Sequence, residues 1–193
     1  PKGIMLTHGN IGSNAKALKD AWGFHNDDIL LHSLPIYHVH GLFVALGCVF
    51  LSGSKIIWTE SFDADQAIEL LPRCTVMMGV PTYYTRLVAS KDLDKSCVSN
   101  MRLFISGSAP LLEDTFIQFY KKTNHHILER YGMTETNIIC SNPVDGRRKP
   151  ETVGMPLKDI NLRIVDDSFN ALEIGEIGHI QVRGPDVFNS YWN

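Results

Sequence analysis

Short apolar runs alternate with helical patterns along the first two thirds of this chain, and no other feature constrains its fold as strongly. The runs have the length of buried strands, and the segments between them carry apolar residues at helical spacing. Strands are predicted over residues 28–34, 55–59, 75–80, 101–105 and 126–131. Helices are predicted over residues 10–22, 42–51, 64–71 (with Asp63 as N-cap), 82–89 and 111–122. Strands and helices that alternate in this way form parallel βαβ units, so the sequence predicts an α/β fold whose sheet is covered by helices.

The pattern changes after Lys149, where two more strands are predicted, over residues 161–165 and 176–182. Gly- and Asp-rich turns separate these strands, and no helix is predicted between them. We therefore expect residues 1–150 to form the α/β part of a domain and residues 151–193 to form a small β-rich lobe of the same domain. The chain starts without Met and stops directly after a strand-like run, so we expect a fragment of a longer protein.

Composition argues against several classes of function. With 193 residues and a net charge of −3, the chain offers no bulk electrostatic attraction to nucleic acid or to an anionic membrane. No apolar run approaches the roughly 20 residues that a membrane-spanning helix needs. The cysteines form no CxxC motif, so we expect buried, reduced thiols at Cys48, Cys74, Cys97 and Cys140. Reduced thiols indicate the cytoplasm or, in a eukaryote, the mitochondrial matrix.

Four unusual loops follow predicted strands, and they locate the binding site. Their sequences are LPIYHVHG, GVPTYYTR, ISGSAP and ERYGMTE. In an open parallel sheet, ligands bind beyond the carboxyl ends of the strands. These loops therefore predict where a ligand binds, but by themselves they do not predict a reaction.

The loop ERYGMTE carries side chains that suit a nucleotide. The ring of Tyr131 can stack on a purine, and Gly132 lets the backbone approach a ligand closely. Thr134 offers a hydroxyl to a phosphate, and Glu135 offers a hard oxygen ligand to Mg²⁺. The same residues also fit a strand-to-helix turn in which Thr134 is the N-cap, so the motif alone leaves both interpretations open.

The loop ISGSAP has two interpretations as well. Small residues after a strand can turn backbone N–H groups toward an anion or a nucleotide. A tight turn in which Pro110 starts the next helix explains the same sequence.

The loop LPIYHVHG places His38 and His40 two residues apart, which in a strand would put both side chains on one face. No carboxylate or cysteine accompanies them locally, so we do not expect a metal there. His38 could instead donate a hydrogen bond to negative charge that develops on phosphate oxygens. The alternative is a histidine satisfied in the core.

The order of the motifs along the whole chain resolves these alternatives. PKG is followed by THGN, LPIYHVHG, GVPTYYTRL, ISGSAPL, ERYGMTET, TVGMPL and GEIGHIQVRGPDVFNSYW. This ordered set closely resembles the acyl-adenylate-forming, or AMP-binding, superfamily over essentially the entire sequence. The resemblance implies a reaction in two steps, with ATP, CoA and a small carboxylic acid as partners. A carboxylate attacks the α-phosphorus of ATP to give an acyl-adenylate and pyrophosphate, and the CoA thiol then displaces AMP.

The resemblance also implies a role for each matching residue. His38, Thr134 and Glu135 would be catalytic: His38 and Thr134 would lie at the α-phosphate, and Glu135 would hold Mg²⁺. Tyr131 would stack on adenine, Lys2 would close the phosphate loop, and Gly154 would lie in another pocket segment. The implied nucleotide site consists of Lys2, Ser106, Gly107, Ser108, Ala109, Pro110, Glu129, Arg130, Tyr131, Gly132, Met133 and Thr134.

Some parts of the family pattern are not in this sequence. The rest of the phosphate loop would precede Pro1, and the ribose-binding aspartate would follow Trp192. The hinge and the small C-terminal domain with the catalytic lysine would come later still. We therefore expect the middle of the large N-terminal domain of such an enzyme, which by itself forms no acyl-CoA.

Two arginines indicate which acid is activated. Arg130 stands where fatty-acid-activating relatives usually have glycine, and Arg86 stands where an apolar or small residue is expected. A guanidinium in an apolar pocket is costly unless a countercharge arrives, and a second carboxylate on the substrate would supply one. Ser108 and His40 would make the same pocket polar. The motifs around these residues closely resemble those of malonyl-CoA synthetases. This resemblance implies malonate as the leading substrate and methylmalonate as a further candidate.

Alternatives remain open for the arginines and for the function. Arg86 could be a solvated helix residue, and Arg130 could form an ion pair with Glu129 or Glu135. The protein would then be a CoA ligase for a monocarboxylate. A non-catalytic nucleotide-binding module is the alternative from another class. The sequence predicts no oligomeric state.

Overall fold

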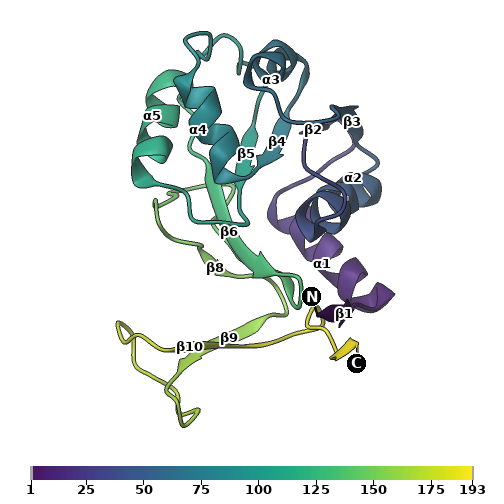
Figure 1. Cartoon of the computed structure of the whole chain (residues 1–193), viewed down its shortest axis with the longest axis vertical. Helices are drawn as coiled ribbons and strands as arrows, with labels where there is room; N and C mark the ends of the chain where they lie inside the picture. The colour runs from purple at the N-terminus through teal and green to yellow at the C-terminus, as the bar shows by residue number, and fades with distance from the viewer. Residues whose placement is uncertain (1, 193) are drawn as a thin grey trace.

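The computed structural model describes residues 2–192, and its centre is a seven-stranded sheet with the order β3-β2-β4-β5-β6-β7-β8 (Figure 1). Its strands are β2 (Ile29–His32), β3 (Lys55–Trp58), β4 (Val76–Gly79), β5 (Leu103–Ser106), β6 (Leu128–Met133), β7 (Asn137–Ser141) and β8 (Met155–Pro156). Strands β3, β2, β4, β5 and β6 run parallel, and β7 and β8 are added antiparallel to their neighbours. The predicted α/β fold with a parallel sheet is confirmed.

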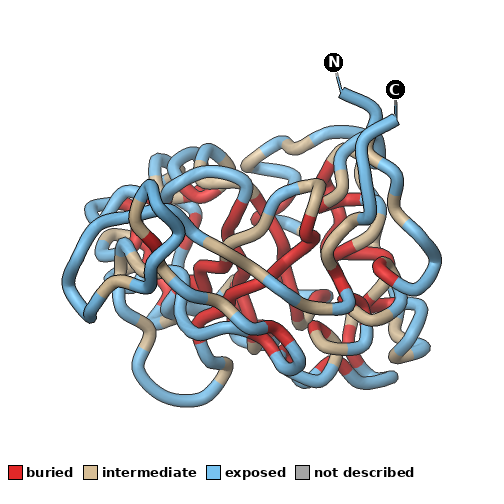
Figure 2. The backbone as a smooth tube through the Cα atoms, turned by 90° about the horizontal axis from the view of Figure 1, so that it is seen from below, coloured by how far each residue is buried: buried red, intermediate tan, exposed pale blue. Residues whose placement is uncertain are grey.

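Helices cover both faces of the sheet because the strand residues alternate between two hydrophobic cores. Leu30 packs into the core beneath the first two helices, and its neighbour Leu31 packs into the core beneath the others. Figure 2 shows the buried segments running through the middle of the molecule between exposed ones. The helices are α1 (His8–Ala21), α2 (Leu46–Ser52), α3 (Ala64–Leu70), α4 (Pro81–Ala89) and α5 (Glu113–Thr123), with the 3-10 turn η2 (Leu71–Arg73) after α3.

The helix starts follow from local chemistry. Thr7 and Asn10 form a capping box at α1, in which each side chain accepts a hydrogen bond from the other residue's backbone N–H. Asp63 caps α3 as predicted, and Pro81 takes the first position of α4, where its missing N–H costs nothing. Within residues 2–192, every helix is too short or too polar to cross a bilayer.

The helix predicted over residues 42–51 divides into two pieces. A π-helix, η1 (His40–Ala45), precedes α2, which ends at Gly53 in the left-handed conformation with φ 67°. A side chain at Gly41 would place its Cβ 2.4 Å from the Pro35 carbonyl oxygen, so this close approach requires glycine. The widened turn therefore begins at His40, inside one of the predicted ligand loops.

The C-terminal part contains only strands among its regular elements. β9 (Asn161–Val165) pairs antiparallel with β10 (His179–Arg183), and β1 (Gly3–Met5) pairs with β11 (Ser190–Trp192), which brings the two ends of the chain together (Figure 1). β10 starts later than the predicted strand because Glu176 takes part in a turn with Glu173. β8 lies beyond residue 150 yet still joins the large sheet. The division at residue 150 stays a prediction.

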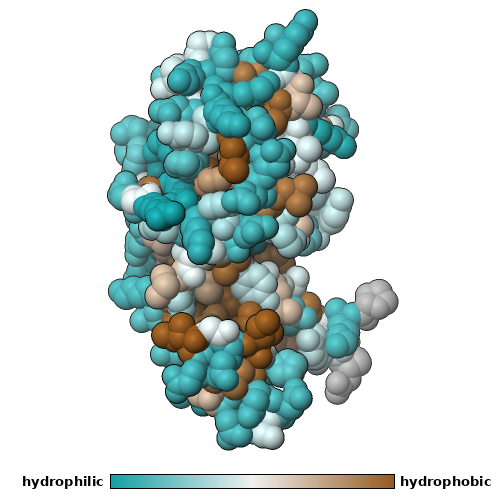
Figure 3. Space-filling view, turned by 90° about the vertical axis from the view of Figure 1, so that its left-hand side faces the viewer, coloured by the Kyte–Doolittle hydropathy of each residue, from teal (hydrophilic) through white to brown (hydrophobic). Residues whose placement is uncertain are grey.

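The surface of this β-rich part is partly apolar. Figure 3 shows hydrophobic side chains gathered in the lower part of the molecule. The exposed large apolar residues of the C-terminal part are Val153, Met155, Phe169, Ile174, Ile177, Ile180, Tyr191 and Trp192. The α/β part, by contrast, keeps its apolar side chains mostly in the two cores.

A buried ion pair ties α1 to the sheet. The carboxylate of Asp28 is fully buried and accepts hydrogen bonds from Arg102 Nε at 2.7 Å and Nη2 at 2.6 Å. Thr75 Oγ1 and the backbone N–H of His25 donate to the same carboxylate. Burial alone would raise the pKa of Asp28, but these hydrogen bonds hold it below its ordinary value. The remaining donors of Arg102 bond to carbonyls at the end of α1, so this ion pair is fully partnered.

Candidate functional site

Three cavities meet where β2, β4, β5 and β6 end. We call them the histidine, proline-loop and tyrosine cavities, with volumes of about 260, 470 and 220 Å³. The histidine cavity is lined by His38, Val39, His40, Ser108, Arg130, Gly132, Met133, Thr134, Glu135 and Ile138. The proline-loop cavity is lined by Ser106, Ser108, Ala109, Pro110, Leu111, Leu112, Glu129, Arg130, Tyr131, Gly132, Glu151 and Val153. The tyrosine cavity is lined by Leu34, Pro35, Tyr37, His38, His40, Gly41, Val80 and Ser108.

Ser108 stands at the junction, because it lines all three cavities. Its backbone is left-handed, with φ 72°, which is uncommon for a residue other than glycine. This conformation brings Ser108 Oγ to 3.3 Å from His40 Nδ1. The sequence predicts that Ser108 lies in the pocket that binds the second carboxylate of the substrate. The structure brings Ser108 together with His40 and Arg130, two other residues predicted for that pocket.

The two histidines of LPIYHVHG differ in their surroundings, so the prediction of strand spacing is wrong. The segment is a turn that enters η1, which leaves His38 exposed and His40 buried. The backbone N–H of His40 donates to His38 Nδ1 at 3.2 Å. Neutral His38 therefore carries its proton on Nε2, which is free to donate a hydrogen bond into the site.

His40 remains neutral. Burial, and then the positive charges around it, including Arg130, hold its pKa well below the ordinary value. Its Nε2 has no hydrogen-bond partner among the described residues. A neutral ring beside Arg130 adds no second positive charge to the site.

Arg130 is the most unusual side chain of the site. It is 6% exposed, and its Nε and Nη2 have no partner within the described part of the chain. None of the ion pairs within residues 2–192 includes Arg130, so the predicted alternative of a pair with Glu129 or Glu135 is wrong. Burial lowers its pKa to about 10, which still leaves the guanidinium charged at neutral pH. Among residues 2–192, Arg130 is thus a buried cation without a countercharge.

The motif ERYGMTE forms a β-hairpin, and the alternative of a strand-to-helix turn with Thr134 as N-cap is wrong. β6 turns directly into β7, and the register shifts between Tyr131 and Gly132. A Cβ at Gly132 would lie 2.0 Å from the Asn137 carbonyl oxygen, so this irregular pairing requires glycine. The hairpin places Thr134 in the histidine cavity and Tyr131 in the proline-loop cavity.

The loop ISGSAP does not start a helix at Pro110. α5 begins at Glu113, after Leu112 as N-cap, so the alternative interpretation of Pro110 is wrong. Ser108, Ala109 and Pro110 are exposed and line the proline-loop cavity. Ser106 lines it too, but is buried, and its Oγ has no hydrogen-bond partner within residues 2–192. The loop therefore forms a wall of this cavity.

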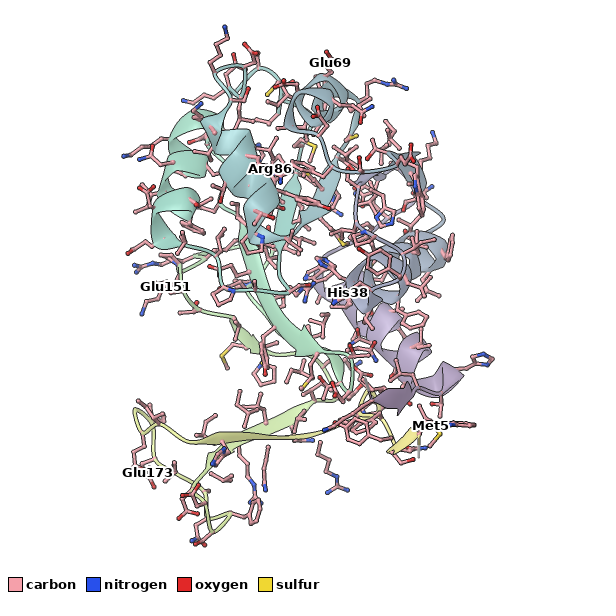
Figure 4. The ribbon with its side chains drawn as sticks, viewed as in Figure 1. Met5, His38, Glu69, Arg86, Glu151 and Glu173 are labelled. Atoms are coloured by element: carbon pink, nitrogen blue, oxygen red, sulfur yellow. The ribbon has the colours of Figure 1, made fainter. Side chains whose placement is uncertain are left out.

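The predicted nucleotide residues divide between the cavities. Glu129 lines the proline-loop cavity, and its carboxylate accepts a hydrogen bond from the Glu151 backbone N–H at 3.2 Å. Burial raises the pKa of Glu129. In Figure 4, Glu151, which lines the proline-loop cavity, and His38, which lines the histidine cavity, are labelled on either side of β6. Lys2 and Gly107 line none of the three cavities, and Met133 lines the histidine cavity.

Glu135 is held by the C-terminal segment. Tyr191 donates a hydrogen bond from its hydroxyl to Glu135 Oε1 at 3.0 Å, and the Phe188 backbone N–H donates to the Glu135 carbonyl at 2.8 Å. Lys2 Nζ lies 4.8 Å from the centre of the Tyr191 ring. Tyr191 therefore connects Lys2 and Glu135, a role that sequence reasoning missed because 56 positions separate Tyr191 from Glu135.

A second group that sequence reasoning missed anchors this segment. Asp186 is 1% exposed, and its carboxylate accepts hydrogen bonds from Ser13 Oγ and from Asn14 Nδ2 on α1. Asn10 Nδ2 donates to the carbonyls on either side of Asp186. The segment THGNIGSN showed only a helix start, and no local signal pointed to a partner more than 170 positions away.

Arg86 lies apart from the other candidates. It is exposed on α4 and lines none of the three cavities (Figure 4). Its charge opposes the rise that burial causes in the pKa of Tyr83, a neighbour on α4 that lines none of these cavities either. Its contact with a substrate carboxylate stays a prediction.

Comparisons with known proteins agree on one family. The family model described as AMP-binding enzyme matches residues 1–192. The chain is 34% identical over 230 residues to the mitochondrial malonate–CoA ligase of Homo sapiens. This alignment covers 100% of this chain and 40% of that protein. ATP-bound MatB from Rhodopseudomonas palustris superposes with a TM-score of 0.97 and 51% identity, over 99% of this chain and 38% of that one. A malonyl-CoA ligase in complex with methylmalonyl-CoA and AMP superposes with a TM-score of 0.90 and 36% identity, over 100% of this chain and 42% of that one.

Proposed function

The chain belongs to the AMP-binding enzyme family, and on this premise we propose that it is part of an ATP-dependent CoA ligase that activates malonate or methylmalonate. It spans less than half the length of the relatives described above, so the proposal concerns the longer enzyme. One observation carries the choice of acid: Arg130 is a buried cation that borders two cavities and has no countercharge in the described part of the chain.

A second carboxylate on the substrate would complete this site. Removing a charge from water costs several kcal/mol, and the cost is recovered when an opposite charge with good hydrogen bonds arrives. The free Nε and Nη2 of Arg130 match the two oxygens of a carboxylate, and each charge-assisted hydrogen bond contributes about 1.5–3 kcal/mol. Ser108 Oγ adds a further hydrogen bond at the same place. A monocarboxylic acid would leave the guanidinium without a partner.

The other residues of the site suit the formation of an acyl-adenylate. His38 lines the histidine cavity, and its Nε2–H, left over when Nδ1 accepts from His40, would bond a phosphate oxygen as charge develops on it. Thr134, in the same cavity, offers its hydroxyl to that phosphate. Tyr131, in the proline-loop cavity, would stack on adenine.

Mg²⁺ is part of the proposal, and Glu135 fits it. Glu135 lines the histidine cavity, and its Oε1 accepts a hydrogen bond from the Tyr191 hydroxyl. Magnesium in nucleotide sites is usually held by one or two carboxylates together with substrate phosphates, and Glu135 would supply one of these carboxylates. When bound, such an ion neutralises charge on the phosphates.

A carboxylate panel on the full-length enzyme tests the proposed function. Malonate, methylmalonate, butyrate and a long-chain fatty acid are compared with ATP and CoA, and formation of acyl-CoA is measured. We expect malonate or methylmalonate to have the highest kcat/KM. Preference for butyrate or the fatty acid would favour the monocarboxylate alternative, and no turnover at all would favour a nucleotide-binding module.

Two substitutions separate the proposed roles in the first step. His38→Ala should slow adenylation by about 10²–10³-fold, since it removes one transition-state hydrogen bond, while the thioester step from supplied acyl-AMP changes less. Glu135→Gln should raise the magnesium concentration needed for adenylation. Equal losses in both steps would make His38 a structural residue, and an unchanged magnesium titration would remove Glu135 from the metal site.

A reducing compartment belongs to the same proposal. All four cysteines are free, and Cys48, Cys74 and Cys140 are buried. Burial raises the pKa of Cys140 and raises that of Cys74 to about 11, so neither is poised as a thiolate. The cytoplasm and the mitochondrial matrix both fit, and fractionation of the native protein would separate them.

A further inference from the structure

Gly107 occupies a buried position directly after β5, beside the guanidinium of Arg130. A Cβ at position 107 would lie 2.3 Å from Arg130 Cζ, 2.4 Å from Nε and 2.8 Å from Nη1. Carbon atoms in proteins do not approach other heavy atoms this closely. The guanidinium therefore occupies the space that a side chain at position 107 would take.

Space, and not backbone conformation, accounts for glycine here. A positive φ favours glycine, as at Gly154 with φ 78°, but Gly107 does not adopt a positive φ. Its backbone N–H continues the pairing of β5 with β4 by donating to the Gly79 carbonyl. An alanine at position 107 could therefore adopt the same backbone, and its methyl group would meet only the flexible end of Arg130 among the nearest atoms.

The position of the guanidinium decides what Arg130 can bind. Arg130 borders the histidine and proline-loop cavities together with Ser108, the residue that follows Gly107. Its Nε, which has no hydrogen-bond partner within residues 2–192, is one of the atoms closest to where a Cβ at position 107 would lie. A methyl group at position 107 would displace the atoms that face the proposed carboxylate.

We propose that Gly107 is a specificity-determining residue, because the niche left by its missing side chain holds the Arg130 guanidinium where a second substrate carboxylate binds. Gly107 acts through Arg130 and is therefore a positioning residue. The functional part of this inference, that Gly107 helps to select dicarboxylates, rests on the proposed function. Its geometric part, that the niche positions Arg130, stands by itself.

A double-mutant cycle in the full-length enzyme tests the proposal. Gly107→Ala, Arg130→Met and the combined variant are compared with wild type, with malonate and butyrate as alternative acids. We expect Gly107→Ala to lower the malonate-to-butyrate ratio of kcat/KM by about 10²-fold, the usual cost of misplacing a binding group by about 1 Å. In the Arg130→Met background, the same alanine should change the ratio by less than about threefold, since the group it displaces is gone.

Gly12→Ala is a matched control. Gly12 lies on α1 with nothing within 4 Å of an added Cβ, so this variant should keep the wild-type ratio. A similar loss of the ratio from Gly107→Ala with and without Arg130 would overturn the proposal, because Gly107 would then act on the nucleotide or on the fold.

A crystal structure of the Gly107→Ala enzyme separates this inference from the proposed function. A displaced guanidinium supports the niche even if wild type prefers butyrate, in which case only the choice of acid fails. A guanidinium in its original place overturns the niche. If Gly107→Ala does not fold, the combined variant decides: folding of the combined variant supports the niche, and failure of both contradicts it.

Discussion

Arg102, directly before β5, and Arg130, in β6, differ in whether their charge has a partner. Arg102 meets the buried carboxylate of Asp28 through two hydrogen bonds, and its other donors bond to backbone carbonyls. Arg130 is more deeply buried, yet its Nε and Nη2 lack partners among the described residues and no carboxylate pairs with it. A buried charge whose partners lie within the fold supports the fold, and one without a partner beside a cavity marks a binding site.

The pKa values of the two regions express this difference. The pKa of Asp28 lies below its ordinary value although burial acts against this, because hydrogen bonds from Arg102 and Thr75 favour the charged form. The pKa of Arg130 is lowered to about 10 because burial disfavours its charged form. Both shifts have the same direction, but in the acid a lowered pKa means stabilised charge and in the base it means destabilised charge.

The largest expected effect belongs to Arg130→Met in the full-length enzyme. Losing one partner of a buried charge pair costs about 3–5 kcal/mol, which is on the order of 10²–10³ or more in kcat/KM for malonate. Activity with butyrate, which needs no countercharge, should be retained or improved. The measurement is the malonate-to-butyrate ratio.

The stability of the same variant sharpens the comparison. Replacing an unpaired buried charge with a methionine should not lower the free energy of unfolding. A uniform drop in activity with both acids, together with lower stability, would show that Arg130 supports the fold as Arg102 does.

Asp28→Asn should have the opposite effects to Arg130→Met: it should lower the stability of the fold and leave the malonate-to-butyrate ratio unchanged. It leaves Arg102, which is 27% exposed, without a full countercharge, and should lower the free energy of unfolding by about 3 kcal/mol while the acid ratio is unchanged. Because the folded pKa of Asp28 is lowered, its stabilisation is present above its ordinary pKa of 3.8 and is lost as the pH falls through the folded value. Urea unfolding at pH 7 and at pH 3 checks both statements. A difference between wild type and variant that does not shrink in acid would contradict the assignment.

His32 represents a third kind of buried polar group, a histidine that burial keeps neutral. It is fully buried without a hydrogen-bond partner within residues 2–192, and burial lowers its pKa from 6.5 to about 4. Between these values the unfolded chain binds a proton that the folded chain does not, so stability falls as the pH falls, by up to about 1.4 kcal/mol per pH unit. His32→Phe should remove this part of the slope. His40 shifts in the same direction and remains in both proteins, so an unchanged slope would exclude His32 as a source.

The smallest expected effect is that of Arg86→Met. Its guanidinium is exposed on α4, and exposed ion pairs contribute about 0.2–1 kcal/mol, so the malonate-to-butyrate ratio should fall by no more than about fivefold. A loss as large as that of Arg130→Met would mean that Arg86 reaches the substrate in the full-length enzyme. An unchanged ratio would leave Arg130 as the only one of these two arginines that contributes to binding the second carboxylate.

The sequence by itself determined the alternation of strands and helices, the cap at Asp63 and the presence of polar motifs at strand ends. These features depend on side-chain period and on local backbone chemistry, which a short segment already contains. The residue types of the motifs also limited the chemistry, since an aromatic ring, a hydroxyl and a carboxylate suit a nucleotide. The motif ERYGMTE alone did not predict β7, because its residues fit both a turn that leads into a helix and a turn that leads into a strand.

Only the tertiary structure decided which of these side chains share a site. Asp28 and Arg102 are 74 positions apart, and the order of the strands brings them together. The pairing of β5 with β6 brings Gly107 beside Arg130, whereas Arg86 lies exposed on α4, although both arginines carry the same charge. Whether a charge finds a partner depends on contacts between distant segments, which strand order and register create and local spacing does not contain.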